Sequence, residues 1–187
     1  LDVSIADLDL VNPYFRAREA RKQLAALGVK VILPAEKYLQ ADLPILSPAV
    51  AGLLRRPSKL TILDVGGDKV GATVLASLGD AIKGKPFRML QVINPFRPFT
   101  DNLMGCMRMK DEIEKASRMS ISGIIGNANL IDDTTADVIY EGYDFVAKVS
   151  HESGLPLEFI TVSAWLEDKI DRERFSCPLL VLHRQLV

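Results

Sequence analysis

Two segments that end in aspartate offer the clearest chemistry in this sequence. Asp7 and Asp9 close one apolar run, and Asp64 closes a second run that continues into Gly66 and Gly67. A parallel strand that ends in aspartate presents its carboxylate at the C-terminal edge of the sheet, where α/β proteins bind ligands. Carboxylates at such an edge indicate Mg²⁺ and phosphate chemistry.

Each of these carboxylates also has a purely structural interpretation. Asp7 and Asp9 alternate along a strand end, so their side chains begin on opposite faces, and either could cap the helix that follows. Taken alone, their DxD pattern favours that interpretation. Asp64 follows four residues typical of a buried strand and precedes glycines whose backbone can approach a ligand closely. This favours a functional role for Asp64, although an apolar run followed by Asp also arises by chance.

Recurring apolar, β-branched runs predict the strands that would carry these residues. They cover residues 3–6, 29–33, 60–65, 88–93, 121–125, 157–162 and 179–182. Segments with helical periodicity cover residues 14–27, 70–82, 100–119 and 132–154, and the third of them is expected to bury Met104, Met107 and Ile113. The proline-rich stretch 34–57 is expected to be a mobile loop or lid around a short helix at 49–54. Alternating strands and helices predict a three-layer α/β fold, with a mostly parallel sheet and helices on both faces.

Composition limits the classes of protein to consider. The 187 residues, 48% of them hydrophobic and 25% charged, suit one domain over residues 1–187. A net charge of -1 gives no general electrostatic attraction to nucleic acid or to an acidic membrane surface, so neither partner is implied by the sequence. Two cysteines, Cys106 and Cys177, stand far apart without CxxC spacing, which fits a reducing cytoplasm.

The order and spacing of these motifs resemble those of the deviant-Walker P-loop ATPases, the group that contains MinD, ParA and the cobyrinic acid diamide synthase type nucleotide-binding domains. By this resemblance, Asp9 would orient the attacking water and Asp7 would support the metal. Asp64, with Gly66 and Gly67, is similar to the Walker B strand and the second switch, in which the aspartate reaches Mg²⁺ through water.

The resemblance extends to the base of the nucleotide. Residues 124–127 are similar to the strand whose terminal asparagine, here Asn127, reads adenine, and Ser163 falls in the segment that covers the base. The resemblance therefore implies ATP and Mg²⁺ as ligands. It also implies a homodimer when ATP is bound, a protein client that the sequence does not identify, and a cytoplasmic, nucleotide-dependent switch.

One element of that family is missing. No GxxxxGK[ST] or KGGxxGK sequence occurs in residues 1–187, so the first strand and the phosphate loop are absent. We expect both to precede Leu1 in the full-length protein, because the loss of a central strand would leave unpaired backbone groups in a core.

Two other functions stay open. One is a non-catalytic interaction domain that keeps the P-loop fold and has lost nucleotide turnover. The other is a Rossmann-type oxidoreductase built on residues 66–71, which would need an acidic ribose ligand about 20 residues further on. The next strand ends at Ile93 and Asn94 instead, which argues against it.

The segment 94–99, Asn-Pro-Phe-Arg-Pro-Phe, follows a predicted strand. Arg97 could contact a nucleotide or a partner there. The favoured interpretation is a rigid loop in which Phe96 and Phe99 pack beneath the next helix, because large aromatic side chains usually belong to the core.

Overall fold

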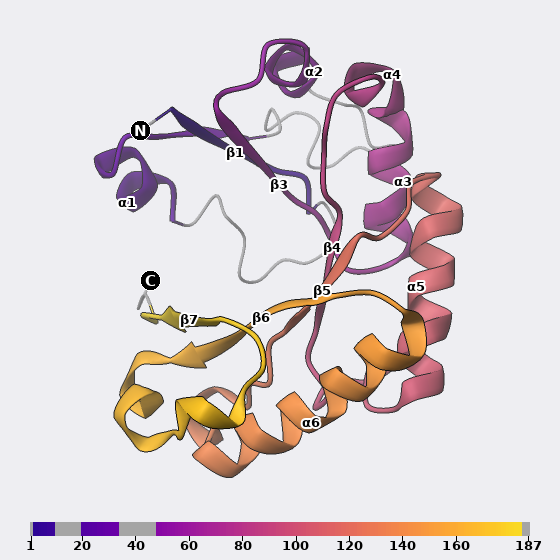
Figure 1. The fold of residues 1–187 in the computed structure, drawn as a ribbon. Helices are drawn as coiled ribbons and strands as arrows, with labels where there is room; N and C mark the ends of the chain where they lie inside the picture. Colours follow the sequence, from indigo (N-terminus) through magenta and orange to yellow (C-terminus); the bar gives the residue numbers. More distant parts are fainter. Residues whose placement is uncertain (1, 10–19, 34–47, 185–187) are drawn as a thin grey trace. The chain divides into compact units, whose positions relative to one another are not determined.

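The computed structural model describes residues 2–9, 20–33 and 48–184 of the chain (Figure 1). It divides into two compact units. The first comprises Leu1–Phe87 with Lys115–Arg118, and the second comprises Arg88–Glu114 with Met119–Leu186. Each has its own parallel sheet flanked by helices, so the predicted α/β class is confirmed. The single domain over residues 1–187 stays a prediction.

The first unit has a sheet of three parallel strands in the order β2-β1-β3. Their bounds are Val3–Asp7 for β1, Val29–Ile32 for β2 and Leu60–Asp64 for β3. Because β1 is flanked on both sides, Ser4, Ala6 and Asp7 are fully buried. The Ser4 hydroxyl is hydrogen-bonded to the Ser58 hydroxyl at 2.6 Å. Strand β3 pairs with β1 only, among the described residues, so one edge of β3 is open.

The helices of the first unit are short. They are α1 (Arg21–Ala26), α2 (Pro48–Arg55), α3 (Lys69–Ser77) and α4 (Gly79–Ile82). Helix α2 confirms the short helix predicted at residues 49–54. Most of the loop predicted around it, residues 34–47, lies outside the described residues. Residues 14–19 of the first predicted helix also lie outside them. The prediction of a single helix over residues 70–82 is wrong in one respect, because the helix is interrupted at Leu78. There the Leu78 N–H donates to Leu75 O, three residues back, and α4 restarts at Gly79.

Gly71 in α3 allows the preceding loop to fold back onto the helix. A Cβ at Gly71 would lie 2.2 Å from the Gly66 carbonyl oxygen, whereas a Cβ at Gly52 in α2 would meet nothing within 4 Å. Gly71→Ala should therefore lower the free energy of unfolding by about 1–3 kcal/mol through overpacking. Gly52→Ala, the matched control, should raise it by about 0.4–1 kcal/mol. Urea unfolding measures both, and equal midpoints for the two variants would contradict this account of the loop.

The second unit has a sheet of four parallel strands in the order β4-β5-β6-β7. Their bounds are Leu90–Ile93, Gly123–Gly126, Leu157–Ser163 and Leu179–Leu182. All seven strands thus occur where the sequence predicts them, with ends that shift by at most two residues. The strands contribute Ile93, Ile124 and Ile160 to a core that packs against the helix α6 (Ala136–Ser153), which runs along β5 and β6 in Figure 1.

Helix α6 has the ends that its sequence predicts. The Thr135 hydroxyl accepts from the Val138 N–H as an N-cap, and Gly154 ends the helix in the left-handed region at φ 68°. A segment with two short 3-10 helices, η3 (Ala164–Lys169) and η4 (Arg172–Arg174), then packs on α6. Phe175 anchors it, with its ring centroid 5.0 Å from that of Tyr143.

Helix α5 (Leu103–Ser117) exposes Met104, a side chain that was expected to be buried. Met104 is 80% exposed, whereas Cys106 and Ile113 are buried. Residues two positions apart in an α-helix point in directions that differ by roughly 200°. A helix that buries residue 106 therefore points residue 104 away from the core. The expected position of Met104 is therefore wrong, and that of Ile113 is right.

Among the described residues, no helix is long and apolar enough to cross a membrane.

Candidate functional site

Two aspartates meet at the carboxyl edge of the first unit's sheet. Asp7 of β1 and Asp64 of β3 are register partners in adjacent parallel strands, so both start from the same face of the sheet. The Leu8 N–H donates to the Asp64 carbonyl oxygen at 2.7 Å, which extends the pairing past Asp7. Asp7 is fully buried, and its Oδ1 accepts the Asp9 N–H at 3.2 Å. That bond turns the chain after β1 and places Asp9 beyond the strand end.

Asp9 lies against the glycine loop that follows β3. A Cβ at Gly66 would lie 3.2 Å from Asp9 Oδ1, so the missing side chain lets the loop approach the carboxylate closely. A Cβ at Gly67 would meet nothing within 4 Å, so no close contact within the described residues requires glycine there. The structure therefore brings Asp7, Asp9, Asp64 and Gly66 together and leaves Gly67 on the open side of the loop.

The N-terminus of α3 already carries a carboxylate. Asp68 is its N-cap, and Asp68 Oδ1 accepts the Gly71 N–H at 2.9 Å. Helix N-termini bind phosphate because their free N–H groups attract anions, and here an anionic side chain takes that role. The Asp68 carboxylate thus occupies a place that a phosphate would take in a phosphate cradle, and the assignment of residues 66–73 as a switch-type loop stays a prediction.

The donors at this edge are carboxylate oxygens. Within the described ranges, no group of three or more His, Cys, Asp or Glu residues is close enough to hold a metal ion. Mg²⁺ at nucleotide sites usually takes one or two carboxylates, with water and phosphate oxygens completing its shell. Asp7 and Asp64 lie beside each other in adjacent strands, so this edge offers two carboxylates, which fits that requirement.

In the second unit, Asn127 directly follows β5. Its backbone N–H donates to Ile93 O at 2.8 Å, and its side-chain Oδ1 accepts the Thr161 hydroxyl at 2.6 Å. Ser163 is the last residue of β6, two positions after Thr161, and it pairs with Leu182 of β7. The structure thus places both predicted base-contacting residues, Asn127 and Ser163, at the carboxyl ends of neighbouring strands.

Thr161 is a residue that the sequence reasoning missed. It lies on β6 among apolar neighbours and is 8% exposed. A polar residue inside an apolar strand was the available signal, since such a side chain needs a partner when buried. Its partner, Asn127, is 34 residues away in the chain.

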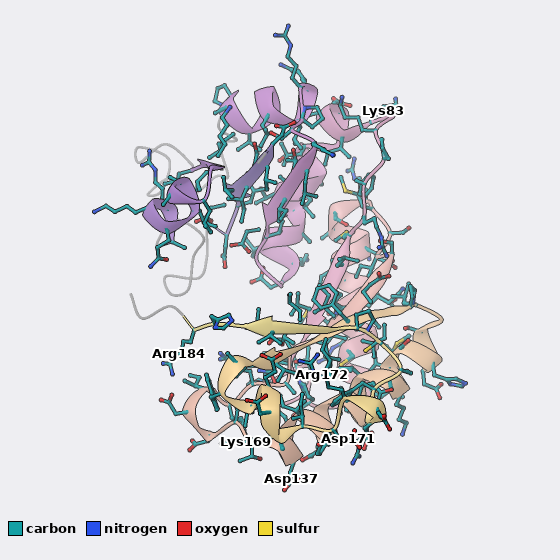
Figure 2. The ribbon with its side chains drawn as sticks, turned by 60° about the vertical axis from the view of Figure 1, so that its left-hand side comes forward. Lys83, Asp137, Lys169, Asp171, Arg172 and Arg184 are labelled. Atoms are coloured by element: carbon teal, nitrogen blue, oxygen red, sulfur yellow. The ribbon has the colours of Figure 1, made fainter. Side chains whose placement is uncertain are left out.

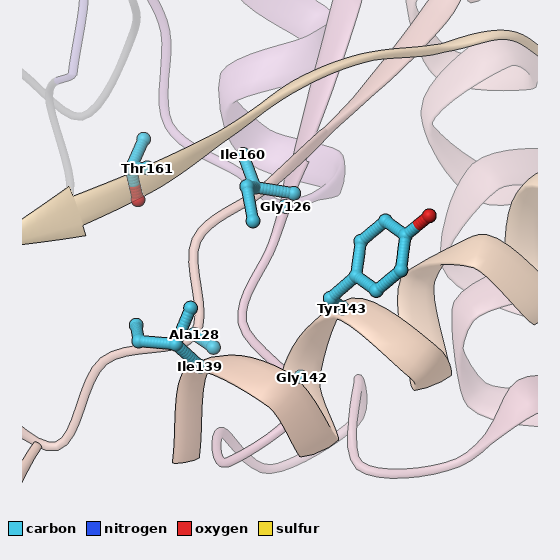
Figure 3. Close-up of a pocket in the computed structure, with 7 residues that line it drawn as sticks. All are labelled: Gly126, Ala128, Ile139, Gly142, Tyr143, Ile160 and Thr161. Atoms are coloured by element: carbon cyan, nitrogen blue, oxygen red, sulfur yellow. The ribbon is translucent and has the colours of Figure 1, made fainter. Parts of the chain in front are cut away.

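A small hollow lies beside this pair. It is lined by Gly126, Ala128, Ile139, Gly142, Tyr143, Ile160 and Thr161 (Figure 3). Its empty volume is about 160 Å³, open solvent included. Ligand pockets are typically about 300–1,000 Å³, so this hollow is too small to hold a nucleotide.

Asn94 connects the loop after β4 to the loop after β5. The Asn94 Nδ2 group donates to Asn129 O at 2.9 Å, and Asn94 Oδ1 accepts the Phe96 N–H. The expectation that Phe99 packs beneath the next helix is wrong, because Phe99 is 63% exposed and has φ 71°. A Cβ at Gly105 would lie 2.4 Å from Phe99 O, so it is the backbone of this loop, and not the Phe99 ring, that packs against the start of α5.

Burial and local contacts act on several ionisable side chains of the second unit. Burial, followed by the nearby Asp101 charge, raises the pKa of the Cys106 thiol to about 11, so it is not a thiolate near neutral pH. Burial alone would raise the pKa of Glu114, but hydrogen bonds from Lys110 and the Ile121 N–H outweigh it and lower that pKa. Arg184, which follows β7 (Figure 2), forms an ion pair with Asp132.

Comparison with known proteins adds evidence on the fold. No family model matches the chain, and no curated protein matches it. A solved structure, the D-threo-3-hydroxyaspartate dehydratase from Delftia sp. HT23, is similar with a TM-score of 0.50 and 14% sequence identity. The match covers 98% of this chain and 53% of that chain, so this chain spans about half the length of that enzyme. At this identity the likeness bears on the fold alone.

Proposed function

We propose that this chain is most of a three-layer P-loop NTPase-like domain that binds and hydrolyses Mg-ATP as a nucleotide-dependent switch. The observation that carries the proposal is the convergence of Asp7, Asp9 and Asp64 with Gly66 at the carboxyl ends of β1 and β3. Carboxylates on parallel strands beside a glycine loop are the arrangement that Mg-nucleotide chemistry uses.

Each residue has a role in the proposal. Asp64 and Asp7 would hold Mg²⁺, which when bound neutralises charge on the phosphate oxygens. Asp9 would accept a hydrogen bond from the attacking water and orient it, and Gly66 lets the loop approach that carboxylate. Within the second unit taken by itself, Asn127 is proposed as a contact to a purine base, with Ser163 on the neighbouring strand.

The open edge of β3 supports the idea that a strand is missing there. Leu60 is 53% exposed and Ile62 is 44% exposed, although both belong to a run typical of a buried strand. The buried Thr61 hydroxyl has no hydrogen-bond partner among the described residues. An open apolar edge invites pairing, and we propose that the strand that carries the phosphate loop pairs with β3.

Nucleotide binding by two forms of the protein tests the proposal. The form extended upstream of Leu1 should bind Mg-ATP, whereas the chain of 187 residues should bind it at least about a hundredfold more weakly. The reason is that the phosphate loop supplies several charge-assisted hydrogen bonds, each contributing about 1.5–3 kcal/mol. Isothermal titration calorimetry on both forms measures the difference.

The possible outcomes separate the alternatives. Equal affinity of the two forms would assign phosphate recognition to residues 66–73. No binding by either form would overturn the proposal. If the extended form binds Mg-ATP but shows no turnover even with its cellular partner, the interaction-domain alternative replaces the ATPase.

A further inference from the structure

Asn127 has a firmly held backbone. A Cβ at Gly126 would lie 2.9 Å from side-chain atoms of Ile160 and Val146, and a Cβ at Gly142 would lie 2.2 Å from the Ala128 Cβ. The residues on both sides of Asn127 are therefore packed tightly against β6 and α6, as Figure 3 shows for Gly126, Ala128, Ile160 and Gly142. Any ligand contact by Asn127 thus depends on the orientation of its side-chain amide.

Thr161 determines that orientation from one end. Its hydroxyl donates to Asn127 Oδ1 at 2.6 Å, and it lies on β6, where it is register-paired with Leu180 of β7. Asn127 is partly exposed, and its side-chain hydrogen bond among the described residues is the one that Oδ1 accepts, with none donated by its Nδ2 group. The oxygen end is thus held by the protein, while the nitrogen end and one oxygen lone pair stay available to a ligand.

We propose that Thr161 is a positioning residue that aligns the Asn127 amide with a purine that carries an amino group at C6. This inference rests on the proposed function and deepens it. Adenine presents an N6 amino donor beside the N7 acceptor, and an asparagine amide pairs with both at once. A purine with a 6-oxo group presents two acceptors there, so an amide with its oxygen held in place makes only one of the two bonds. An amide that is free to turn discriminates less between the 6-amino and the 6-oxo purine.

The test compares ATP with inosine triphosphate, its 6-oxo analogue, on the upstream-extended protein. The wild type should bind Mg-ATP more tightly than the inosine nucleotide. Thr161→Val keeps the shape and removes the hydroxyl, so it should weaken Mg-ATP binding about fivefold to tenfold and reduce the preference to near unity. Thr161→Ser restores the hydroxyl and should recover the preference, which a purely structural role for the methyl group would not allow. Asn127→Ala should lose the preference as well.

The outcomes distinguish this inference from the function on which it rests. A wild type that binds neither nucleotide would overturn the proposed function and this inference with it. A wild type that prefers Mg-ATP, together with a Thr161→Val variant that keeps the same preference, would overturn the inference alone. If Thr161→Val does not fold, Thr161→Ala and Thr161→Ser make the same comparison, and equal preference in those two variants would also overturn it.

Discussion

Replacing Asp64 by alanine is expected to weaken binding of Mg-ATP to the extended protein about ten- to a hundredfold, as loss of an outer-shell metal partner does. Metal-free ATP should bind with nearly unchanged affinity, because the carboxylate acts through Mg²⁺. Asp64 is register-paired with the fully buried Asp7, so the variant leaves only one carboxylate of that pair. Calorimetry with and without excess EDTA separates the two affinities.

Asp68→Asn is the matched control for Asp64→Ala. Asp68 lies on the same loop and caps α3 through the Gly71 N–H, and asparagine caps helices equally well. The control removes a negative charge from the loop without removing the cap, so Mg-ATP affinity should stay within about twofold. If Asp68→Asn weakens Mg-ATP binding as much as Asp64→Ala does, general charge rather than metal coordination would explain the result.

The sequence predicts the elements of this fold well because local signals mark their ends. Helix α6 illustrates this, since Thr135 and Gly154 cap the ends of a run whose apolar residues face one side. Strand β7 matches its predicted bounds because a short apolar run has little freedom in where it stops. Helix α5 shows where local signals are insufficient. The pattern of polar and apolar residues in 103–117 allows more than one buried face, and tertiary packing buries the face with Cys106 and exposes Met104.

The arrangement of the candidate site depends on non-local pairing that the sequence does not encode locally. Asp7 and Asp64 meet because β1 and β3 pair in one register, and a shift of one residue would move every side chain to the other face. Their positions at strand ends are predictable, whereas their pairing is a property of the sheet. The hydrogen bond between Asn127 and Thr161 has the same origin, because it requires β5 and β6 to be adjacent.

Asp9→Asn is expected to leave Mg-ATP affinity within about twofold and to slow single-turnover hydrolysis about a hundredfold or more. Asp9 lies beyond the end of β1 against Gly66, and asparagine fills the same space without the negative charge. A group that orients the attacking water stabilises the transition state rather than the bound nucleotide. Rapid-quench measurement of hydrolysis, with affinity measured in parallel on the same preparation, gives both quantities.

Asp2→Asn is the control for Asp9→Asn, because Asp2 lies at the opposite end of the same strand. Its Oδ2 accepts the Lys59 N–H at 2.8 Å, a bond that asparagine can keep through its own side-chain oxygen. Turnover should therefore be unchanged in Asp2→Asn. Were Asp9→Asn to weaken binding and turnover by the same factor, Asp9 would support the bound nucleotide and not the attacking water. The roles of Asp9 and Asp7 would then have to be exchanged, since Asp7 is the other carboxylate that β1 brings to this edge.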